Sequence, residues 1–203
     1  MEIRFPASIE WQGEVPGHLR LLDQTRLPHE EVYLECRTVS SLEKAILELS
    51  VRGAPAIGVA AGYGAVLAAQ EAMDRSGPAF LQEVRALLDR LGRARPTAVN
   101  LTLALGRARR VLEEKAEAPP REIAAALLEE ARRIHQEDRA VCRAMGEAGA
   151  ALLPQKARLL THCNTGFLAT GGEGTALAVV YRAAAAGKEI QVFADETRPL
   201  WQG

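Results

Sequence analysis

The sequence contains few cysteines and almost no net charge. Its three cysteines, Cys36, Cys142 and Cys163, lie far apart and form no CxxC or CxH pair, which argues against a zinc site or a disulfide scaffold. The 25 basic and 26 acidic residues give a formal charge of -1, so no overall field would draw the chain onto nucleic acid or an anionic membrane. We expect no metal and no cofactor, and any bound anion must be met by a local group of residues.

Membrane-spanning segments are also missing from the sequence. The opening stretch MEIRFPASIEW has neither a basic leader region nor a long apolar core. No later apolar run reaches spanning length without a charge or a glycine-rich break. With 48% hydrophobic and 25% charged residues, the composition is typical of a soluble globular protein, and we expect a cytoplasmic protein in a reducing compartment.

Residues 1–153 predict a mainly helical domain that begins with a small antiparallel sheet. The β-type runs LRLLDQTRLP and EVYLEC indicate the sheet. Residues 40–43 have the spacing of a capping box and predict a helix that starts there and ends at Gly53. Its expected buried residues are Leu42, Ala45, Ile46 and Leu49.

Further helices are expected along the rest of this domain. Pro55 suits the first turn of a central helix, in which Gly58 and Gly62 would let another backbone approach closely. Helices should also follow Ser76 and Pro96. The stretch Pro120–Leu152 predicts one long helix or two in succession, with a recurring apolar set: Ile123, Leu127, Ala131, Ile134, Val141, Met145 and Leu152.

The pattern changes after the PQK linker. Residues 157–203 contain a compact strand ARLLTH, a helix that opens on glycines, and a second strand KEIQVFADE, which together predict a parallel β-α-β unit. The fold class is therefore α/β, with a helical first domain and the beginning of a Rossmann-like second domain. Since two strands and one helix cannot cover both faces of a sheet, we expect a truncated domain or one completed by a partner.

Cys163 is the strongest candidate for chemistry. It falls at the carboxyl end of the first parallel strand, where open α/β sheets place their ligands. The helix that follows the glycines could supply the positive potential that a reactive thiol needs. The alternative is a small hydrophobic side chain packed at a strand end.

The neighbours of Cys163 carry weaker signals. His162 is disfavoured as its base because adjacent strand residues point to opposite faces, and we favour a histidine that is hydrogen-bonded beneath the sheet. Asn164 and Thr165 could hold a turn or bind a ligand. The stretch GFLATGGEG matches neither a P-loop nor GxGxxG, but exposed amides at a helix start would suit a polar or anionic group.

Two arginines precede predicted helices and could bind an anion. In Arg52-Gly53-Ala54-Pro55 a guanidinium stands beside free backbone N–H groups at a helix amino terminus, where a phosphate would gain charge-assisted hydrogen bonds. Arg95, followed by Pro96, repeats the arrangement. For each arginine the alternative is a solvated surface residue.

Four motifs carry a resemblance to a known family: VRGAPAIGVAAGYG, RPTAVNL, THCNTGFLAT and DETRPLWQG. In this order they closely resemble the methylthioribose-1-phosphate isomerases, whose superfamily also holds ribose-1,5-bisphosphate isomerase and the regulatory subunits of initiation factor 2B. The resemblance covers nearly the whole chain. It implies a helical domain joined to a Rossmann-like domain, with a sugar phosphate held between them, and a possible homodimer.

The resemblance also implies residue roles. Cys163 would be catalytic, and Arg52, Gly53, Ala54, Arg95 and Gln202 would bind the substrate. The reaction implied is the aldose–ketose conversion of 5-methylthioribose 1-phosphate into 5-methylthioribulose 1-phosphate in methionine salvage. A thiolate could remove the C2 proton, although hydride transfer is an open alternative.

One element of the family pattern is not found in these 203 residues. The partner catalytic residue of the isomerases is an aspartate later in the second domain, and Asp195 belongs to the DETRP motif instead. We therefore expect the chain by itself to be weakly active or inactive. A noncatalytic regulatory or interaction protein and a ribose-1,5-bisphosphate isomerase are the alternatives, and RPTAVNL disfavours the second.

Overall fold

The computed structural model describes residues 5–195. Three antiparallel strands come first, β1 (Ile9–Gly13), β2 (Gly17–Leu22) and β3 (Tyr33–Cys36), in the order β1-β2-β3. The predicted small sheet is therefore confirmed. Leu19 and Leu21 of β2 are fully buried, so the sheet contributes one face to the core beneath the helices.

Helix α1 (Val39–Leu47) differs from the prediction at both ends. Thr38 is its N-cap and forms the capping box with Ser41, so the helix starts before the predicted position. It ends at Leu47, and Leu49 has a left-handed backbone with φ 63°, which a helix cannot contain. The expected burial of Leu42, Ala45 and Ile46 is confirmed, whereas Gly53 starts the next helix rather than ending this one.

Helix α2 (Ala54–Glu71) is the central element, as predicted. Every residue from Ala56 to Ala69 is buried, which is typical of a helix enclosed on all sides. Its glycines allow close neighbours: a Cβ on Gly58 would lie 2.8 Å from Asn100 Cβ, and a Cβ on Gly62 would lie 3.2 Å from Ile134 Cδ1. Helices α3 (Gly77–Gly92), α4 (Val99–Glu114) and α5 (Pro120–Leu152) pack around it.

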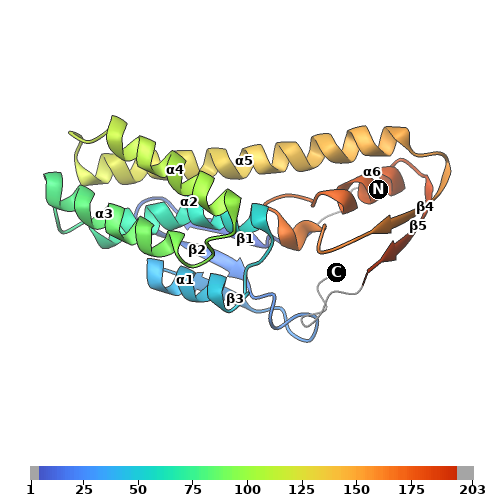
Figure 1. The fold of residues 1–203 in the computed structure, drawn as a ribbon, viewed down its shortest axis with the longest axis horizontal. Helices are drawn as coiled ribbons and strands as arrows, with labels where there is room; N and C mark the ends of the chain where they lie inside the picture. Colours follow the sequence, from blue (N-terminus) through green and yellow to red (C-terminus); the bar gives the residue numbers. More distant parts are fainter. Residues whose placement is uncertain (1–4, 196–203) are drawn as a thin grey trace.

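Helix α5 (Pro120–Leu152) is a single long helix that runs along the whole molecule (Figure 1). Its first half behaves as predicted, because Ile123, Leu127 and Ala131 are buried. Its second half does not. Val141, Met145 and Leu152 were expected on the buried face but are 55%, 38% and 85% exposed.

Small residues occupy the buried face of this second half instead. A Cβ on Gly146 would lie 2.9 Å from the Ala178 carbonyl oxygen, and a Cβ on Gly149 would lie 2.5 Å from Val179 Cγ2. Helix α6 (Ala176–Ala185) therefore packs against the small residues of α5 and leaves the large apolar ones outside. The apolar periodicity correctly predicted helix α5, but in its second half it predicted the wrong buried face.

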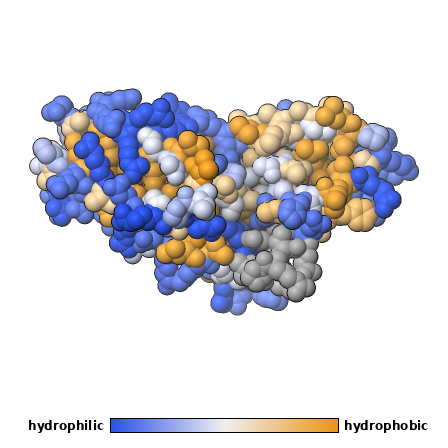
Figure 2. Space-filling view, in the orientation of Figure 1, coloured by the Kyte–Doolittle hydropathy of each residue, from blue (hydrophilic) through white to orange (hydrophobic). Residues whose placement is uncertain are grey.

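The last elements form the predicted β-α-β unit, in which β4 (Lys156–Thr161) pairs with β5 (Glu189–Ala194) in parallel and α6 connects them. A short turn, η1 (Phe167–Ala169), lies between β4 and α6. Leu160 and Phe193 are neighbours in the strand register and are 74% and 42% exposed. Figure 2 shows an apolar area at this end of the molecule. No helix in residues 5–195 is both long and apolar enough to cross a membrane.

Candidate functional site

Arg52 is a buried cation at the amino end of α2, with an exposed fraction of only 8%. Its Nε donates to Gln24 Oε1 over 3.2 Å, and its Nη2 donates to the Gln24 carbonyl over 3.4 Å. It forms no ion pair within residues 5–195. The sequence alternative of a solvated arginine is therefore wrong. A buried guanidinium without a carboxylate partner is costly to maintain, so it favours an anionic ligand.

The nearby Asp23 carboxylate favours the charged form of Arg52. Burial lowers the pKa of the Arg52 guanidinium, and the Asp23 carboxylate opposes that shift. Burial alone would raise the pKa of Asp23, but hydrogen bonds from Thr25 and Ser50 bring it below its ordinary value. Asp23 is thus ionised, yet it lies beyond ion-pair distance from the guanidinium.

The amino terminus of α2 lies directly beside Arg52. Its N-cap is Gly53, with φ 95°, and no side chain caps the helix. The first-turn N–H groups of a helix have no intrahelical acceptor, and here Ala54 is exposed. A Cβ on Gly53 would lie 2.6 Å from the Ala169 backbone, so only glycine fits. At Ala54 the helix end is therefore exposed, so an anion can reach it. At Gly53 it is packed closely against the loop that follows β4.

Cys163 begins that loop, directly after β4 and His162. It is exposed, whereas Cys36 and Cys142 are buried and their pKa values are raised by burial. Its backbone φ is 69°, a left-handed value that is rare for residues with a side chain and that often marks functional sites. The alternative of a packed hydrophobic side chain is excluded by this exposure.

The loop from Cys163 to Thr175 is closed by its own hydrogen bonds. The Thr165 carbonyl accepts from the Thr175 N–H over 2.8 Å. The fully buried Thr170 hydroxyl oxygen accepts from the N–H groups of Gly172 and Gly174. Thr165 thus holds the turn, as one of the two sequence interpretations expected.

Helix α5 fastens the same loop at Gly171. The Gly171 N–H donates to Asp138 Oδ2 over 2.7 Å, and its carbonyl accepts from His135 Nε2 and Arg139 Nε over 2.9 and 3.0 Å. Since a carbonyl only accepts, His135 Nε2 carries the hydrogen, and Nδ1 accepts from the Tyr63 hydroxyl at 3.1 Å. We call Gly171, His135 and Asp138 the loop anchor.

Burial shifts the pKa values of His135 and Asp138, the two titratable members of the loop anchor. It lowers the pKa of His135 to about 4, with the Arg139 charge acting in the same direction, so the imidazole is neutral at pH 7. Burial also raises the pKa of Asp138, while the Gly171 hydrogen bond and Arg139 oppose the rise. Neither His135 nor Asp138 was predicted from the sequence, because nothing in the periodicity of α5 marks these polar positions.

Gln24 connects Arg52 to the loop. Its side chain accepts from Arg52 and donates from Nε2 to the Leu168 carbonyl over 2.7 Å. The guanidinium is therefore one side chain away from the loop that Cys163 begins. Gln24 follows the end of β2 in a turn-like stretch, and no sequence pattern indicated that it would be buried.

The remaining predicted site residues stand apart from this group or lie outside the described residues. Arg95 is half-buried, and no hydrogen bond in residues 5–195 joins it to Arg52 or Cys163, so its role stays a prediction. Gln202 lies outside the described residues. His162 pairs through Nδ1 with Asp195 Oδ2 over 2.9 Å, but it is exposed, so the expected position beneath the sheet is wrong. Within the described part, Asn164 Nδ2 is buried without a hydrogen-bond partner.

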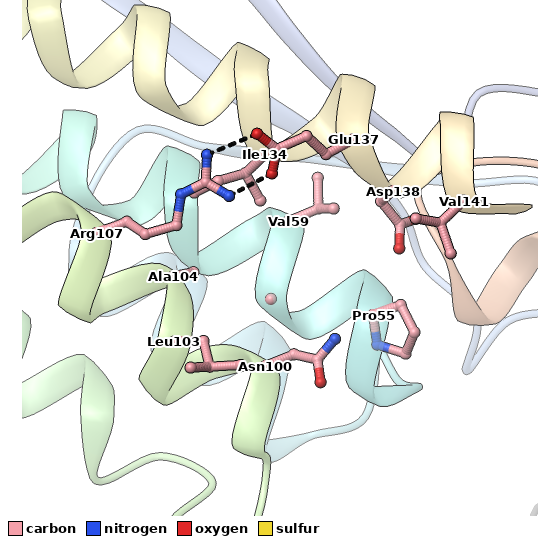
Figure 3. Close-up of a pocket in the computed structure, with 11 residues that line it drawn as sticks. Pro55, Val59, Asn100, Leu103, Ala104, Arg107, Ile134, Glu137, Asp138 and Val141 are labelled. Atoms are coloured by element: carbon pink, nitrogen blue, oxygen red, sulfur yellow. Dashed lines mark hydrogen bonds and ion pairs between the residues drawn. The ribbon is translucent and has the colours of Figure 1, made fainter.

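A separate pocket of about 190 Å³ lies between α2, α4 and α5 (Figure 3). Pro55 and Val59 of α2, Leu103 of α4 and Val141 of α5 form much of its apolar wall, and Arg107 pairs with Glu137 at one end. Neither Arg52 nor Cys163 lines it, so the sugar-phosphate site expected from the sequence is not assigned to this pocket.

Comparisons with known proteins place these residues in context. A family model described as the initiation factor 2 subunit family matches residues 50–203. The methylthioribose-1-phosphate isomerase of Geobacter sulfurreducens is 48% identical over 196 residues, which cover 97% of this chain and 56% of that protein. The isomerase of Alkalilimnicola ehrlichii is 51% identical over 197 residues, or 97% and 55%. The chain therefore spans about half the length of these curated relatives.

Two solved structures share the fold. The 5-methylthioribose 1-phosphate isomerase of Pyrococcus horikoshii OT3 superposes with a TM-score of 0.89 at 37% identity, over 98% of this chain and 55% of the other. The delta subunit of translation initiation factor eIF-2B from A. fulgidus gives a TM-score of 0.81 at 43% identity, over 98% and 57%. The similarity thus extends to both an isomerase and an initiation factor subunit.

Proposed function

This chain belongs to the initiation factor 2 subunit family, and from that premise we propose that it carries the phosphate grip and the reactive cysteine of a methylthioribose-1-phosphate isomerase. The reaction converts 5-methylthioribose 1-phosphate into 5-methylthioribulose 1-phosphate. One observation supports this most: the buried Arg52, unpaired with any acid in residues 5–195, is linked through Gln24 to the loop that begins with the exposed Cys163.

The grip is formed by Arg52 and the first turn of α2. The phosphate accepts hydrogen bonds from the guanidinium and from the N–H groups of Gly53 and Ala54, and the dipole of an 18-residue helix adds to their attraction. Because the guanidinium is already buried, an incoming phosphate satisfies donors that would otherwise lack partners. Arg95 supplies a further substrate contact in this proposal.

The phosphate on the anomeric oxygen prevents ordinary hemiacetal opening, so the ring must open with acid help. The bond between C1 and the ring oxygen breaks as that oxygen is protonated. The Cys163 thiolate then removes the C2 proton, which leaves an enol between C1 and C2. A proton returns to C1, and the C2 hydroxyl loses its proton to become the ketone.

The acid of this sequence is not assigned to any residue of the chain. The resemblance implies an aspartate in a later part of the isomerases, and the matched residues cover only 56% of the Geobacter sulfurreducens protein. Loss of one member of an acid–base pair commonly lowers the rate about 100-fold or more. The proposal therefore assigns substrate binding and the base to these residues, and full turnover to a chain that includes the acid.

The test supplies 5-methylthioribose 1-phosphate and follows the ketose by NMR. It compares the 203-residue chain with a chain extended through any downstream coding sequence. Turnover by the longer chain, lost in Cys163→Ala and Cys163→Ser and kept in the exposed control Arg37→Ala, supports the proposal. Repeating the reaction in D₂O separates the routes: the proton route introduces deuterium at C1, and hydride transfer does not.

A second candidate is a noncatalytic sugar-phosphate-binding protein. It is favoured by the 43% identity to the A. fulgidus initiation factor subunit over 98% of this chain. The same assay separates the two functions. A longer chain that binds the sugar phosphate through Arg52 but never forms the ketose contradicts the isomerase and supports the binding protein.

A further inference from the structure

Gln24 is held between two parts of the site that are far apart in the sequence. The residue is only 2% exposed, and its backbone N–H donates to the carbonyl of Ser50, which is close to Arg52 in the chain, over 3.0 Å. The residue is thus fixed by its backbone to the segment that leads into α2. Its side-chain amide reaches across to Leu168, 144 positions later.

The two ends of the Gln24 amide have only one consistent orientation. Arginine has no acceptor, so the atom 3.2 Å from Arg52 Nε must be the amide oxygen. A backbone carbonyl has no donor, so the atom 2.7 Å from the Leu168 oxygen must be the amide NH₂. Each partner independently requires the same orientation, and a flipped amide would lose both hydrogen bonds.

The loop side of this bridge is closely packed. Leu168 lies in η1, and its neighbour Ala169 touches Gly53 so tightly that a Cβ on Gly53 would lie 2.6 Å away. The loop is closed at Thr165 and Thr175, and Cys163 stands at its start with a left-handed backbone. Because the loop is packed and closed in this way, we expect a shift of η1 to move the backbone at Cys163 as well.

On the Arg52 side of the Gln24 side chain, the guanidinium has an N–H donor that no residue in 5–195 accepts from. Nε and Nη2 of Arg52 are engaged by Gln24, and Nη1 donates to no acceptor in residues 5–195. An anion that binds there draws on the same guanidinium that holds the Gln24 oxygen. Since hydrogen bonds in a buried chain polarise one another, an anion bound at Arg52 would change the strength of the bond from Gln24 to Leu168.

We propose that Gln24 is a positioning residue that couples an anion bound at Arg52 to the loop that carries Cys163. The inference rests on the proposed function, which supplies the anion. Phosphate binding would then prepare the cysteine loop, so that the thiol adopts its working geometry when the sugar phosphate is seated. Gln24 itself touches neither the phosphate nor the reacting carbons in this proposal.

The test uses inorganic phosphate and the reactivity of Cys163. Phosphate binding is measured by calorimetry, and alkylation of Cys163 by iodoacetamide is followed by peptide mass spectrometry, with Cys36 and Cys142 shielded by burial. In the wild-type chain, saturating phosphate should change the alkylation rate about fivefold or more. In Gln24→Met, phosphate should still bind while the alkylation rate no longer responds.

Gln70 offers a matched control. Its amide accepts from the Gly17 N–H over 2.7 Å and donates to the Gly17 carbonyl over 3.0 Å, so it also bridges two backbone groups, but near the far end of α2. Gln70→Met should retain the full phosphate response. If Gln24→Met fails to fold, Gln24→Glu at saturating phosphate replaces it, because the carboxylate keeps the acceptor for Arg52 and loses the donor to Leu168.

The outcomes separate the inference from the proposed function. A response that persists in a folded Gln24 variant means that phosphate shields the thiol directly and overturns the coupling. Phosphate binding to the wild type with no change in alkylation overturns the coupling and leaves the phosphate grip intact. Absence of phosphate binding to the wild type removes the grip and the coupling together.

Discussion

The backbone N–H of Gly171 donates a hydrogen bond to the Asp138 carboxylate over 2.7 Å, and this contact joins the loop after β4 to the long helix α5. The Gly171 carbonyl is held from the same helix by His135 and Arg139. The loop that begins with Cys163 is therefore fixed at Gly171 by α5 and at Leu168 by Gln24. Both attachments come from residues that precede β4 in the chain.

Replacing Gly171 by alanine should destabilise the protein. A Cβ there would lie 2.6 Å from His135 Cδ2 and 3.1 Å from Val59 Cγ2, and the imidazole cannot move away without losing its bond to Tyr63. Such overpacking costs about 1 to 3 kcal/mol, which urea unfolding would measure. Gly106→Ala is the control: a Cβ there meets nothing within 4 Å, so a gain of up to about 1 kcal/mol is expected in α4. Equal stability of Gly171→Ala and wild type would contradict the anchor.

His135 should make stability depend on pH between about 6.5 and 4. Its pKa is lowered by burial from 6.5 to about 4 in the folded state, so below pH 6.5 the unfolded chain binds a proton that the folded chain refuses. Stability is present above this window and is lost as the pH falls through it, by roughly 3 kcal/mol in total. Asp138 acts in the opposite direction, because burial raises its pKa.

The variant His135→Gln isolates this effect. An amide can still donate to the Gly171 carbonyl and accept from Tyr63, but it does not titrate. Unfolding free energies of wild type and His135→Gln, measured from pH 7 to pH 4, should converge as the pH falls. Parallel curves across the window would show that the imidazole is not the titrating group.

Arg52→Ala should weaken phosphate binding by about 1 to 3 kcal/mol, because it removes charge-assisted hydrogen bonds in a buried setting. Calorimetry with inorganic phosphate measures the change. Arg37→Ala serves as the control, since Arg37 is exposed and pairs with Glu35 at the surface. Unchanged affinity in Arg52→Ala would remove Arg52 from the site.

Cys163→Gly should be more stable than Cys163→Ala by about 1 kcal/mol, because only glycine adopts the left-handed φ of 69° at little cost. Both variants should lack the thiol-dependent turnover of the longer chain. The comparison separates backbone strain from chemistry, since the two variants differ only in the methyl group. If alanine is tolerated as well as glycine in urea unfolding, the conformation at Cys163 carries no strain.

The sequence predicted much of the fold because its signals were local. Pro55 marked the start of α2 correctly, and the glycines of the same helix predicted the close approach of its neighbours. The capping-box spacing at residues 40–43 indicated a helix but missed its start, because Thr38 and Ser41 form the actual box. The family, confirmed by the match over residues 50–203, was also recognisable from short motifs.

The candidate site was harder to predict from the sequence than the fold. Cys163 and Arg52 were selected from their places at a strand end and a helix start; the structure exposes the first and buries the second, and their roles stay predictions. Gln24, His135 and Asp138 were missed. A buried glutamine or histidine has no periodic signature, because its burial depends on partners elsewhere in the chain.

The amino-acid order by itself determined where helices and strands form, since capping, periodicity and the freedom of glycine act over a few residues. It also contains the motifs of the family. Only the tertiary structure decided which face of α5 is covered, because Gly146 and Gly149 admit α6 while Val141 and Met145 remain outside. It likewise decided that Gln24 meets Leu168, since hydrogen bonds between distant segments depend on how whole elements pack.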